Sequence, residues 1–170
     1  DMKTTMRRFV IVAVRRAFLA LIVIGSLLTI FIAATPQGKA GFRAALFVPQ
    51  VLDVPFKPQP WLASDPVRHE VTYPQEIGTG VADVYRIPDG EPRAAVLLFL
   101  GANAAGRDDE DVVNLGNALA RGGFAVMFHW SPTMALQHNI DSVEIDNLVW
   151  AFQFLEQQDW VDSKRVGIGG

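Results

Sequence analysis

Three short apolar runs, separated by patterns typical of helices, constrain the fold of this chain more than any other feature. The runs are AAVLLFL at 94–100, FAVMFHW at 124–130 and, after Lys164 and Arg165, the shorter VGIGG of the segment 164–170. Continuous apolar runs of this length are typical of strands buried on both faces of a parallel sheet. Because a helix pattern follows each of the first two runs, the order predicts an α/β fold with right-handed crossovers.

The first helix pattern lies between the runs at 94–100 and 124–130. It begins with four acidic residues at 108–111, which suit the positive end of a helix dipole, and closes at Gly122–Gly123, a typical C-cap. Consecutive acids fan around a helix axis, so we do not expect them to converge on a metal ion. The apolar residues recur at helical spacing: Val112, Leu115 and Leu119.

The second helix pattern is expected to start at Asn139 or Asp141 and to run to about Gln158. Asp141, Glu144 and Asp146 are interpreted as its cap and its polar face. The residues expected on or near its apolar face are Ile140, Val143, Leu148, Phe152 and Leu155.

Two further strands are expected before the parallel ones. Residues 67–73 and 81–87 alternate between apolar and polar side chains, and the segment 77–80 between them has turn chemistry. We therefore expect an antiparallel pair at the start of a mostly parallel sheet that occupies residues 67–170.

The N-terminal part of the chain has the composition of a membrane anchor. A basic segment, residues 1–16, precedes the 18 uncharged residues Ala17–Ala34, which as a helix would be about 27 Å long. We expect this helix to span a lipid bilayer with a cytoplasmic N-terminus and the rest outside, periplasmic or extracellular. A cleaved signal, leaving a secreted protein, is the alternative, although Ile32 is a poor residue three positions before a cut after Ala34.

Composition separates this anchor from the rest of the chain. Residues 1–34 carry a net charge of +4 and residues 35–170 a net charge of −7, which disfavours nucleic acid as a partner. The chain contains no cysteine. Residues 35–66 hold a cluster of five prolines, from Pro49 to Pro66, and are expected to form an extended spacer on or leading to the sheet domain.

The loop that follows the first apolar run, LFLGANAAGRDD at 98–109, has two possible uses. A dinucleotide site would need a glycine where Asn103 stands, and the acids at 108–111 would oppose a pyrophosphate. The next run also ends in Phe128, His129 and Trp130, without the acidic residue that such sites use. Small residues instead suit a loop whose backbone N–H groups approach an oxyanion.

The stretch from about residue 73 to 170 resembles the α/β-hydrolase superfamily, and most of all its esterase and dienelactone-hydrolase-like branch. The motifs that carry the resemblance are YRIPDG, AAVLLFLGANAAGRDD, NALARGGFAVMF and DNLVWAFQFLEQQDWVDSKRVGIGG. In these enzymes the last motif leads into the nucleophile elbow, G-x-S-x-G. Gly170 matches the first glycine of that elbow, with Gly169 as an alternative register.

The resemblance implies ester or lactone hydrolysis through an acyl-enzyme, on a small ester-like substrate, with no cofactor and no metal. The nucleophile, serine or in dienelactone-type chemistry cysteine, would lie two positions after Gly170. The acid and the histidine of the triad would follow it, so none of His69, His129 and His138 is expected to be the triad histidine. This chain by itself is then an inactive N-terminal portion of the enzyme.

Within the chain, the resemblance assigns part of the oxyanion hole to the backbone N–H groups of Ala102 and Asn103. The frequent His-Gly pair at this strand end is Leu100–Gly101 here. His129 is a candidate to line the site, with a buried structural histidine as the alternative. The rival interpretation of the whole chain is a membrane-tethered, non-catalytic α/β domain that binds or scaffolds a partner.

Overall fold

A computed structural model of the 170 residues describes positions 2–52, 54–76, 78–100, 106–137 and 142–170, with side chains from residue 14 onward except at 135–137. The chain divides into two compact units, residues 1–45 and residues 46–170.

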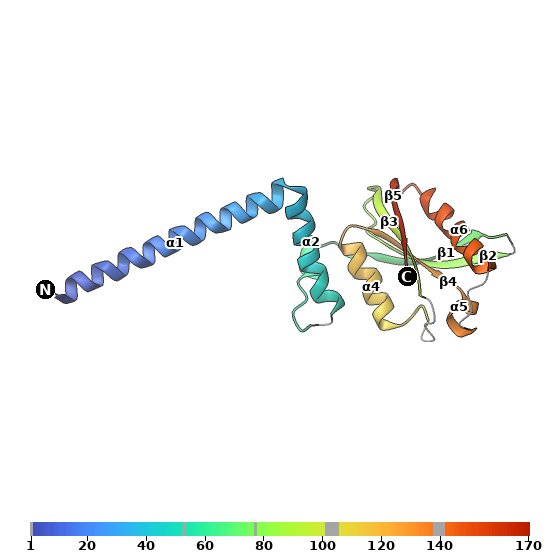
Figure 1. Ribbon diagram of the computed structural model, residues 1–170, viewed down its shortest axis with the longest axis horizontal. Helices are drawn as coiled ribbons and strands as arrows, with labels where there is room; N and C mark the ends of the chain where they lie inside the picture. The colour runs from blue at the N-terminus through green and yellow to red at the C-terminus, as the bar shows by residue number, and fades with distance from the viewer. Residues whose placement is uncertain (1, 53, 77, 101–105, 138–141) are drawn as a thin grey trace. The chain divides into compact units, whose positions relative to one another are not determined.

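The first unit consists of helix α1 (Met2–Ala34) and the beginning of helix α2 (Pro36–Val51) (Figure 1). Within α1, Val14–Ala34 has a mean hydropathy of 2.7 and none of it is buried. This segment is long and apolar enough to cross a membrane, and a helix of this kind near the N-terminus is also typical of a signal sequence. Thr35 caps α2, because its hydroxyl accepts a hydrogen bond from the Gly38 N–H at 2.9 Å.

Much of the proline-rich stretch is ordered within the second unit, and helix α2 occupies part of the segment 35–66 that was expected to be extended. The short helix α3 (Gln59–Leu62) precedes the sheet, and the Gln59 side chain donates a buried hydrogen bond to the Ala118 carbonyl at 2.8 Å. Gln50 and Asn114 exchange two hydrogen bonds, of 2.6 and 2.9 Å. The prolines cluster from Pro49 onward, so residues 37–48 contain none and are free to form a helix.

The second unit is built on one five-stranded sheet in the order β1-β2-β4-β3-β5. The strands are β1 (Val67–Pro74), β2 (Thr79–Arg86), β3 (Arg93–Phe99), β4 (Ala125–Trp130) and β5 (Val161–Gly169). β2 is antiparallel to β1 and to β4, whereas β3 is parallel to both β4 and β5. The predicted antiparallel start and the three parallel strands are confirmed.

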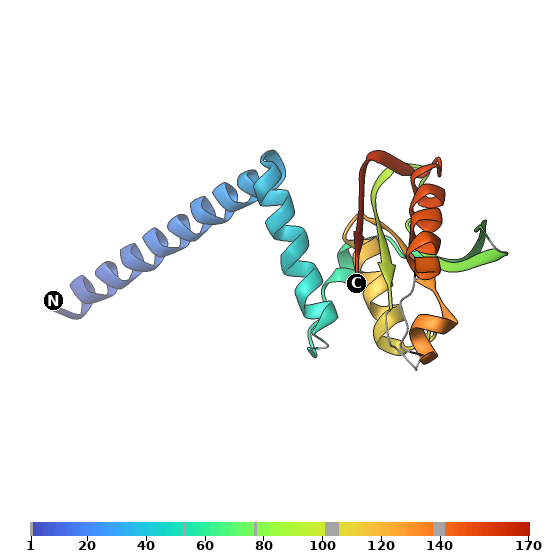
Figure 2. The same ribbon diagram turned by 45° about the vertical axis from the view of Figure 1, so that its right-hand side comes forward.

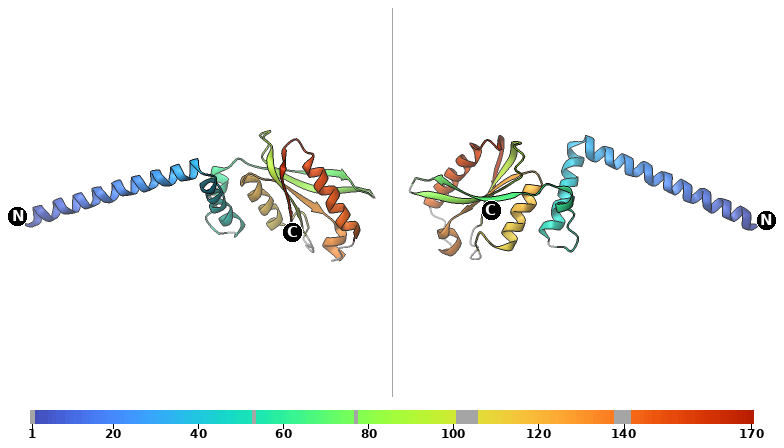
Figure 3. Two further views of the ribbon diagram at one scale, coloured as in Figure 1. Left: turned by 45° about the horizontal axis from the view of Figure 1, so that its top comes forward. Right: turned by 180° about the vertical axis from the view of Figure 1, so that it is seen from behind.

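Helices α4 (Glu110–Arg121) and α6 (Ser142–Glu156) cover opposite faces of this sheet (Figures 2 and 3), and the short helix α5 (Pro132–Gln137) follows β4. Each face has its own apolar core, because successive strand residues point to opposite sides. In β4, Val126 and Phe128 pack on the α4 side, whereas Ala125 and Met127 pack on the α6 side.

The predicted ends of α4 are also confirmed. The Asp109 carboxylate accepts hydrogen bonds from the N–H groups of Asp111 and Val112, which caps the first turn. At the other end Gly123 has a φ of 96°, a left-handed conformation that glycine adopts without strain.

The buried face of α6 agrees in part with the expected one: Leu155 is fully buried and Phe152 packs against the same core, whereas other positions differ. Its buried residues are Glu144, Ala151 and Leu155, while Val143 is 51% exposed and Ile140 lies outside the described residues. The buried positions are separated by seven and four residues, so they form one stripe of the helix. Glu144, which was expected on the polar face, lies on this stripe and is buried.

The contact between α4 and β2 gives a test of this packing. A Cβ added at Gly116 would lie 2.8–2.9 Å from Tyr85 ring atoms, and Tyr85 is fully buried. We expect Gly116→Ala to lower the free energy of unfolding by about 1–3 kcal/mol, although alanine favours the helix by about 1 kcal/mol. Urea unfolding followed by tryptophan fluorescence measures this change.

Gly167→Ala is the matched control, because nothing lies within 4 Å of a Cβ at that position. A Gly116→Ala protein as stable as the wild type would show that α4 does not pack this closely on Tyr85.

Candidate active site at the carboxyl edge of the sheet

The carboxyl ends of the three parallel strands meet at one edge of the sheet. Phe99 of β3 is paired with His129 of β4, and Leu98 of β3 with Gly169 of β5. After β3 the chain forms β4 on one side of β3 and then β5 on the opposite side. The direction in which strands are added to the sheet therefore reverses at β3. Open α/β sheets bind ligands at such a reversal point, outside the carboxyl ends of the strands.

Gly170, the predicted start of the nucleophile elbow, directly follows β5 at this edge. A Cβ at Gly170 would lie 2.3 Å from the ring of Phe99, so a side chain is excluded unless that ring moves. At Gly169, the alternative register, the nearest atom to an added Cβ is a Leu98 methyl group at 3.4 Å. The need for glycine is therefore greater at Gly170.

The predicted oxyanion donors Ala102 and Asn103 lie outside the described residues, as does His138. The first described residue after Ala102 and Asn103 is Gly106, which has a φ of 81°. A Cβ added at Gly106 would lie 3.4 Å from the nearest atom of the Trp130 ring. Only glycine adopts this conformation readily, so the chain turns sharply at Gly106 before α4 begins.

An ion-pair cluster attaches the same end of the loop to β1 and β2. Arg107 Nε lies 3.1 Å from Asp83 Oδ2, and Arg107 Nη2 lies 2.5 Å from Glu70 Oε2. Arg68 Nη2 lies 3.0 Å from Asp83 Oδ2 and 2.8 Å from Asp108 Oδ1. Residues 107 and 108 are thereby held against the sheet.

Asp83 is the centre of this cluster, because its side chain is 4% exposed and both arginines bond to the same carboxylate oxygen. The hydrogen bond to Asp83 raises the pKa of Arg68, and burial of the guanidinium opposes part of that rise. A carboxylate with two charged partners is stable in this buried position.

His129 projects from β4 on the other face, toward α6, and is 3% exposed. Its Nδ1 forms a hydrogen bond with the Tyr73 hydroxyl, and the Tyr73 ring stacks on Phe154 with ring centres 5.4 Å apart. Burial lowers the pKa of His129 because it disfavours the imidazolium, and the negative charge of Glu144 offsets part of that effect. The side chain is therefore neutral at pH 7.

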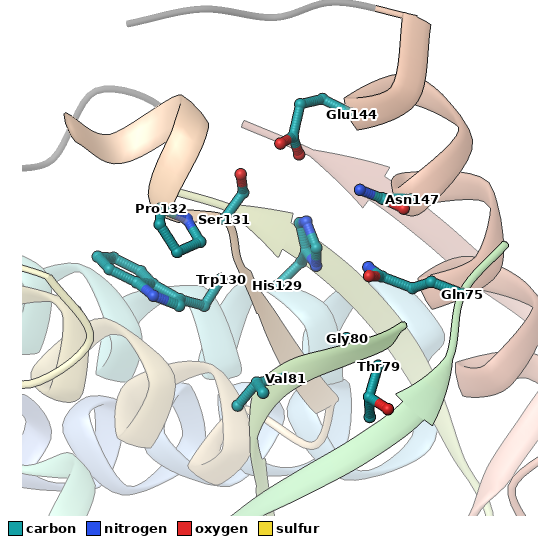
Figure 4. Close-up of a pocket in the computed structure, with 10 residues that line it drawn as sticks. All are labelled: Gln75, Thr79, Gly80, Val81, His129, Trp130, Ser131, Pro132, Glu144 and Asn147. Atoms are coloured by element: carbon teal, nitrogen blue, oxygen red, sulfur yellow. The ribbon is translucent and has the colours of Figure 1, made fainter. Parts of the chain in front are cut away.

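A cavity of about 210 Å³ lies beside His129 (Figure 4). It is lined by Gln75, Thr79, Gly80, Val81, His129, Trp130, Ser131, Pro132, Glu144 and Asn147. Sequence reasoning selected only His129 from this set. The sequence contains two signals for other lining residues. Ser131–Pro132 is a typical helix start, and in the structure the Ser131 hydroxyl accepts a hydrogen bond from the Met134 N–H at 3.2 Å. Glu144 shares the spacing of the buried residues of α6.

The Asp83 cluster predicts that replacing Asp83 lowers the free energy of unfolding far more than replacing an exposed carboxylate. We expect Asp83→Asn to lower the free energy of unfolding by about 1–3 kcal/mol, because two partly buried guanidinium groups lose their shared charge. Asp65→Asn removes the partner of Arg121 but affects a carboxylate that is 87% exposed, and it should cost less than about 1 kcal/mol. Equal losses in urea unfolding would contradict the central role of Asp83.

The lowered pKa of His129 predicts the direction of a pH effect. Below about 6.5 the unfolded chain takes up a proton that the buried imidazole resists. The free energy of unfolding should therefore fall as the pH is lowered from about 6.5 toward the pKa of the folded state. Urea unfolding at a series of pH values measures this slope.

His129→Phe should reduce that slope. His69→Phe is the control, because burial also lowers the pKa of His69 and its replacement should leave the His129 contribution in place. An unchanged slope in His129→Phe would show that His129 titrates normally in the folded protein.

Comparison with known proteins identifies the architecture. The chain is similar to the esterase from Pyrobaculum calidifontis, with 17% identity over 86% of this chain and 46% of that one and a TM-score of 0.51. It is also similar to a Klebsiella pneumoniae protein provisionally assigned as a dienelactone hydrolase (15% identity, 62% and 49% coverage, TM-score 0.50). A hypothetical protein from Pseudomonas aeruginosa gives 19% identity, 63% and 36% coverage, and a TM-score of 0.50.

The chain therefore spans between a third and a half of the length of these structures. No protein-family model matches the sequence, and no curated protein matches it in sequence. The likeness is one of fold, and it agrees with the motifs read from the sequence. The sheet and its helices have the architecture of part of an α/β-hydrolase, of the kind found in esterases and dienelactone hydrolase-like proteins.

Proposed function

We propose that this chain contributes the oxyanion loop and the start of the nucleophile elbow to a membrane-anchored serine hydrolase that cleaves a carboxylic ester or lactone. One observation carries the proposal: the loop after β3 and Gly170 after β5 start from adjacent parallel strands, at the same edge of the sheet. α/β-Hydrolases need these two elements side by side, because one supplies N–H donors and the other the nucleophile.

In the proposed reaction, a serine two positions after Gly170 attacks the carbonyl carbon while a histidine removes its proton. The carbonyl oxygen becomes negatively charged and accepts hydrogen bonds from the Ala102 N–H, the Asn103 N–H and the N–H that follows the nucleophile. The alcohol leaves with the proton from the histidine, and water then hydrolyses the acyl-enzyme. The acid and the histidine follow the nucleophile in chain order.

An apolar surface on the second unit supports the proposal that further elements pack there in the whole enzyme. β5 is paired only with β3 among the described strands, and Ile168 on it is 54% exposed. Ile145 and Val149 of α6 are 55% and 49% exposed, and together these three side chains border an open cleft of about 490 Å³. Additional strands beside β5 and a helix against α6 would remove this surface from water.

The proposed membrane anchor is helix α1. Its apolar segment Val14–Ala34 is long enough for a bilayer, and basic residues precede it. The hydrolase domain would then lie outside the cytoplasm and act on an ester-like substrate near the membrane.

Removing a single backbone donor tests the proposed oxyanion hole. In the protein expressed from the complete reading frame, Ala102→Pro removes one N–H, and we expect kcat for an activated ester to fall about 10²–10³-fold with little change in KM. Ala105→Pro places the same ring in the same loop outside the proposed donors, so it should retain most of the activity.

The nucleophile is tested in the same assay. Alanine in place of the residue two positions after Gly170 should abolish turnover, and the 170-residue chain alone should hydrolyse no activated ester. Serine-dependent turnover by the 170 residues, or equal kcat values for the two proline variants, would contradict the proposed site. A whole protein with no ester hydrolysis would favour a tethered binding domain instead.

A further inference from the structure

We propose that the cavity beside His129 is a binding site for a small, uncharged polyol. The site is formed by described residues at the carboxyl end of β4. They come from β2, β4, α5 and α6, together with Gln75 directly after β1 and Ser131 directly after β4. Its recognition chemistry comes from a buried imidazole whose second nitrogen has no partner in the protein, surrounded by groups that both donate and accept hydrogen bonds.

The Nε2 atom of His129 is buried and has no hydrogen-bond partner within the described part of the chain. A buried nitrogen left without a partner costs free energy, so native proteins satisfy such groups with water or a ligand. The ring points into the space framed by Glu144, Asn147 and Gln75 (Figure 4). The cavity, at about 210 Å³, has room for more than a single water molecule.

The hydrogen bond between Tyr73 and His129 determines which role Nε2 plays. The Tyr73 hydroxyl is buried, so its proton needs an acceptor, and Nδ1 of His129 lies within hydrogen-bond distance of it. We therefore assign the Tyr73 hydroxyl as the donor and Nδ1 of His129 as the acceptor. Because a neutral imidazole carries one proton, Nε2 has the N–H and donates it toward the cavity.

Tyr73 is well placed to fix this arrangement. It is 1% exposed, stacks on Phe154 and leaves no room for a side chain at Gly80, where a Cβ would lie 2.4 Å from its ring. Burial raises the pKa of Tyr73, so its hydroxyl keeps its proton. The donor at His129 is therefore set before any ligand binds.

The other lining groups select the charge of the ligand. Glu144 is 6% exposed and supplies carboxyl oxygens, and no lining residue is cationic, so an anion has no charged partner. An ammonium group has no lone pair for the His129 N–H. A hydroxyl group accepts from His129 and donates to Glu144 or to the Asn147 carbonyl oxygen, and several hydroxyls in one molecule satisfy several of these groups together.

The cavity also lies close to the proposed reaction site. His129 is the neighbour of Phe99 in the sheet, and neighbouring strands are about 4.8 Å apart, so β4 lies about 10 Å from β5. If the proposed hydrolase function holds, the polyol would be the alcohol part of the ester; this identification rests on that function. The binding itself does not depend on that function.

Binding is tested on the full chain in detergent micelles, with ¹⁵N-labelled histidine and long-range proton–nitrogen spectra. The probes are glycerol, inorganic phosphate and methylammonium. We expect glycerol to shift the His129 Nε2 signal saturably, with a midpoint on the order of 10 mM for a ligand of about six heavy atoms. His69, which does not line the cavity, is the internal control and should not shift.

Two substitutions on α6 test whether glycerol binds in this cavity. Asn147→Leu removes a lining amide and fills part of the cavity, so it should abolish the glycerol shift. Gln153→Leu also replaces a side-chain amide by leucine, at an exposed position outside the cavity, and should leave the shift intact. Thr79→Val, which removes a lining hydroxyl, repeats the test from β2 should Asn147→Leu not fold.

Four results would overturn the proposal. They are the absence of a saturable shift, a response to phosphate or methylammonium but not to glycerol, parallel shifts of His129 and His69, and unchanged glycerol binding in Asn147→Leu. None of these measurements uses ester hydrolysis, so failure here is distinct from failure of the proposed enzymatic function.

Discussion

Burial of β3 between two parallel neighbours is the constraint on which the rest of this structure depends. β3 is hydrogen-bonded to β4 on one side and to β5 on the other. Its side chains alternate between two cores, with Ala95 and Leu97 on the α6 side and Val96 and Leu98 on the α4 side. Both faces therefore need a helix, and the crossovers bring three strand ends to one edge.

Polar groups on the two faces hold this edge in different ways. On the α4 side, Asp83 accepts from Arg68 and Arg107 and so attaches the residues that follow the oxyanion loop. On the α6 side, Tyr73 holds His129 in a neutral, oriented state beside a cavity. The first arrangement satisfies its buried charge within the protein, whereas the second leaves a donor directed at space that a ligand can occupy.

The strands and α4 were predictable from local pattern, because apolar runs, alternation and the residues at 109 and 122–123 act over short distances. The helix at 36–51 was not predicted, because the extended conformation that prolines favour was assigned to all of 35–66, although the prolines cluster only from Pro49 onward. Most of the cavity was missed for a different reason. Gln75, Ser131 and Glu144 line one cavity only through strand pairing and helix packing, and the negative charge of Glu144 favoured an exposed position although its spacing matches the buried residues of α6.

The most direct test of the account is to label the protein from the complete reading frame with a fluorophosphonate and map the modified residue by mass spectrometry. Such a reagent reacts with a serine activated by a neighbouring base. The account predicts one labelled serine, two positions after Gly170. Absence of labelling, or labelling of Ser131 in the cavity instead, would contradict the proposed nucleophile elbow.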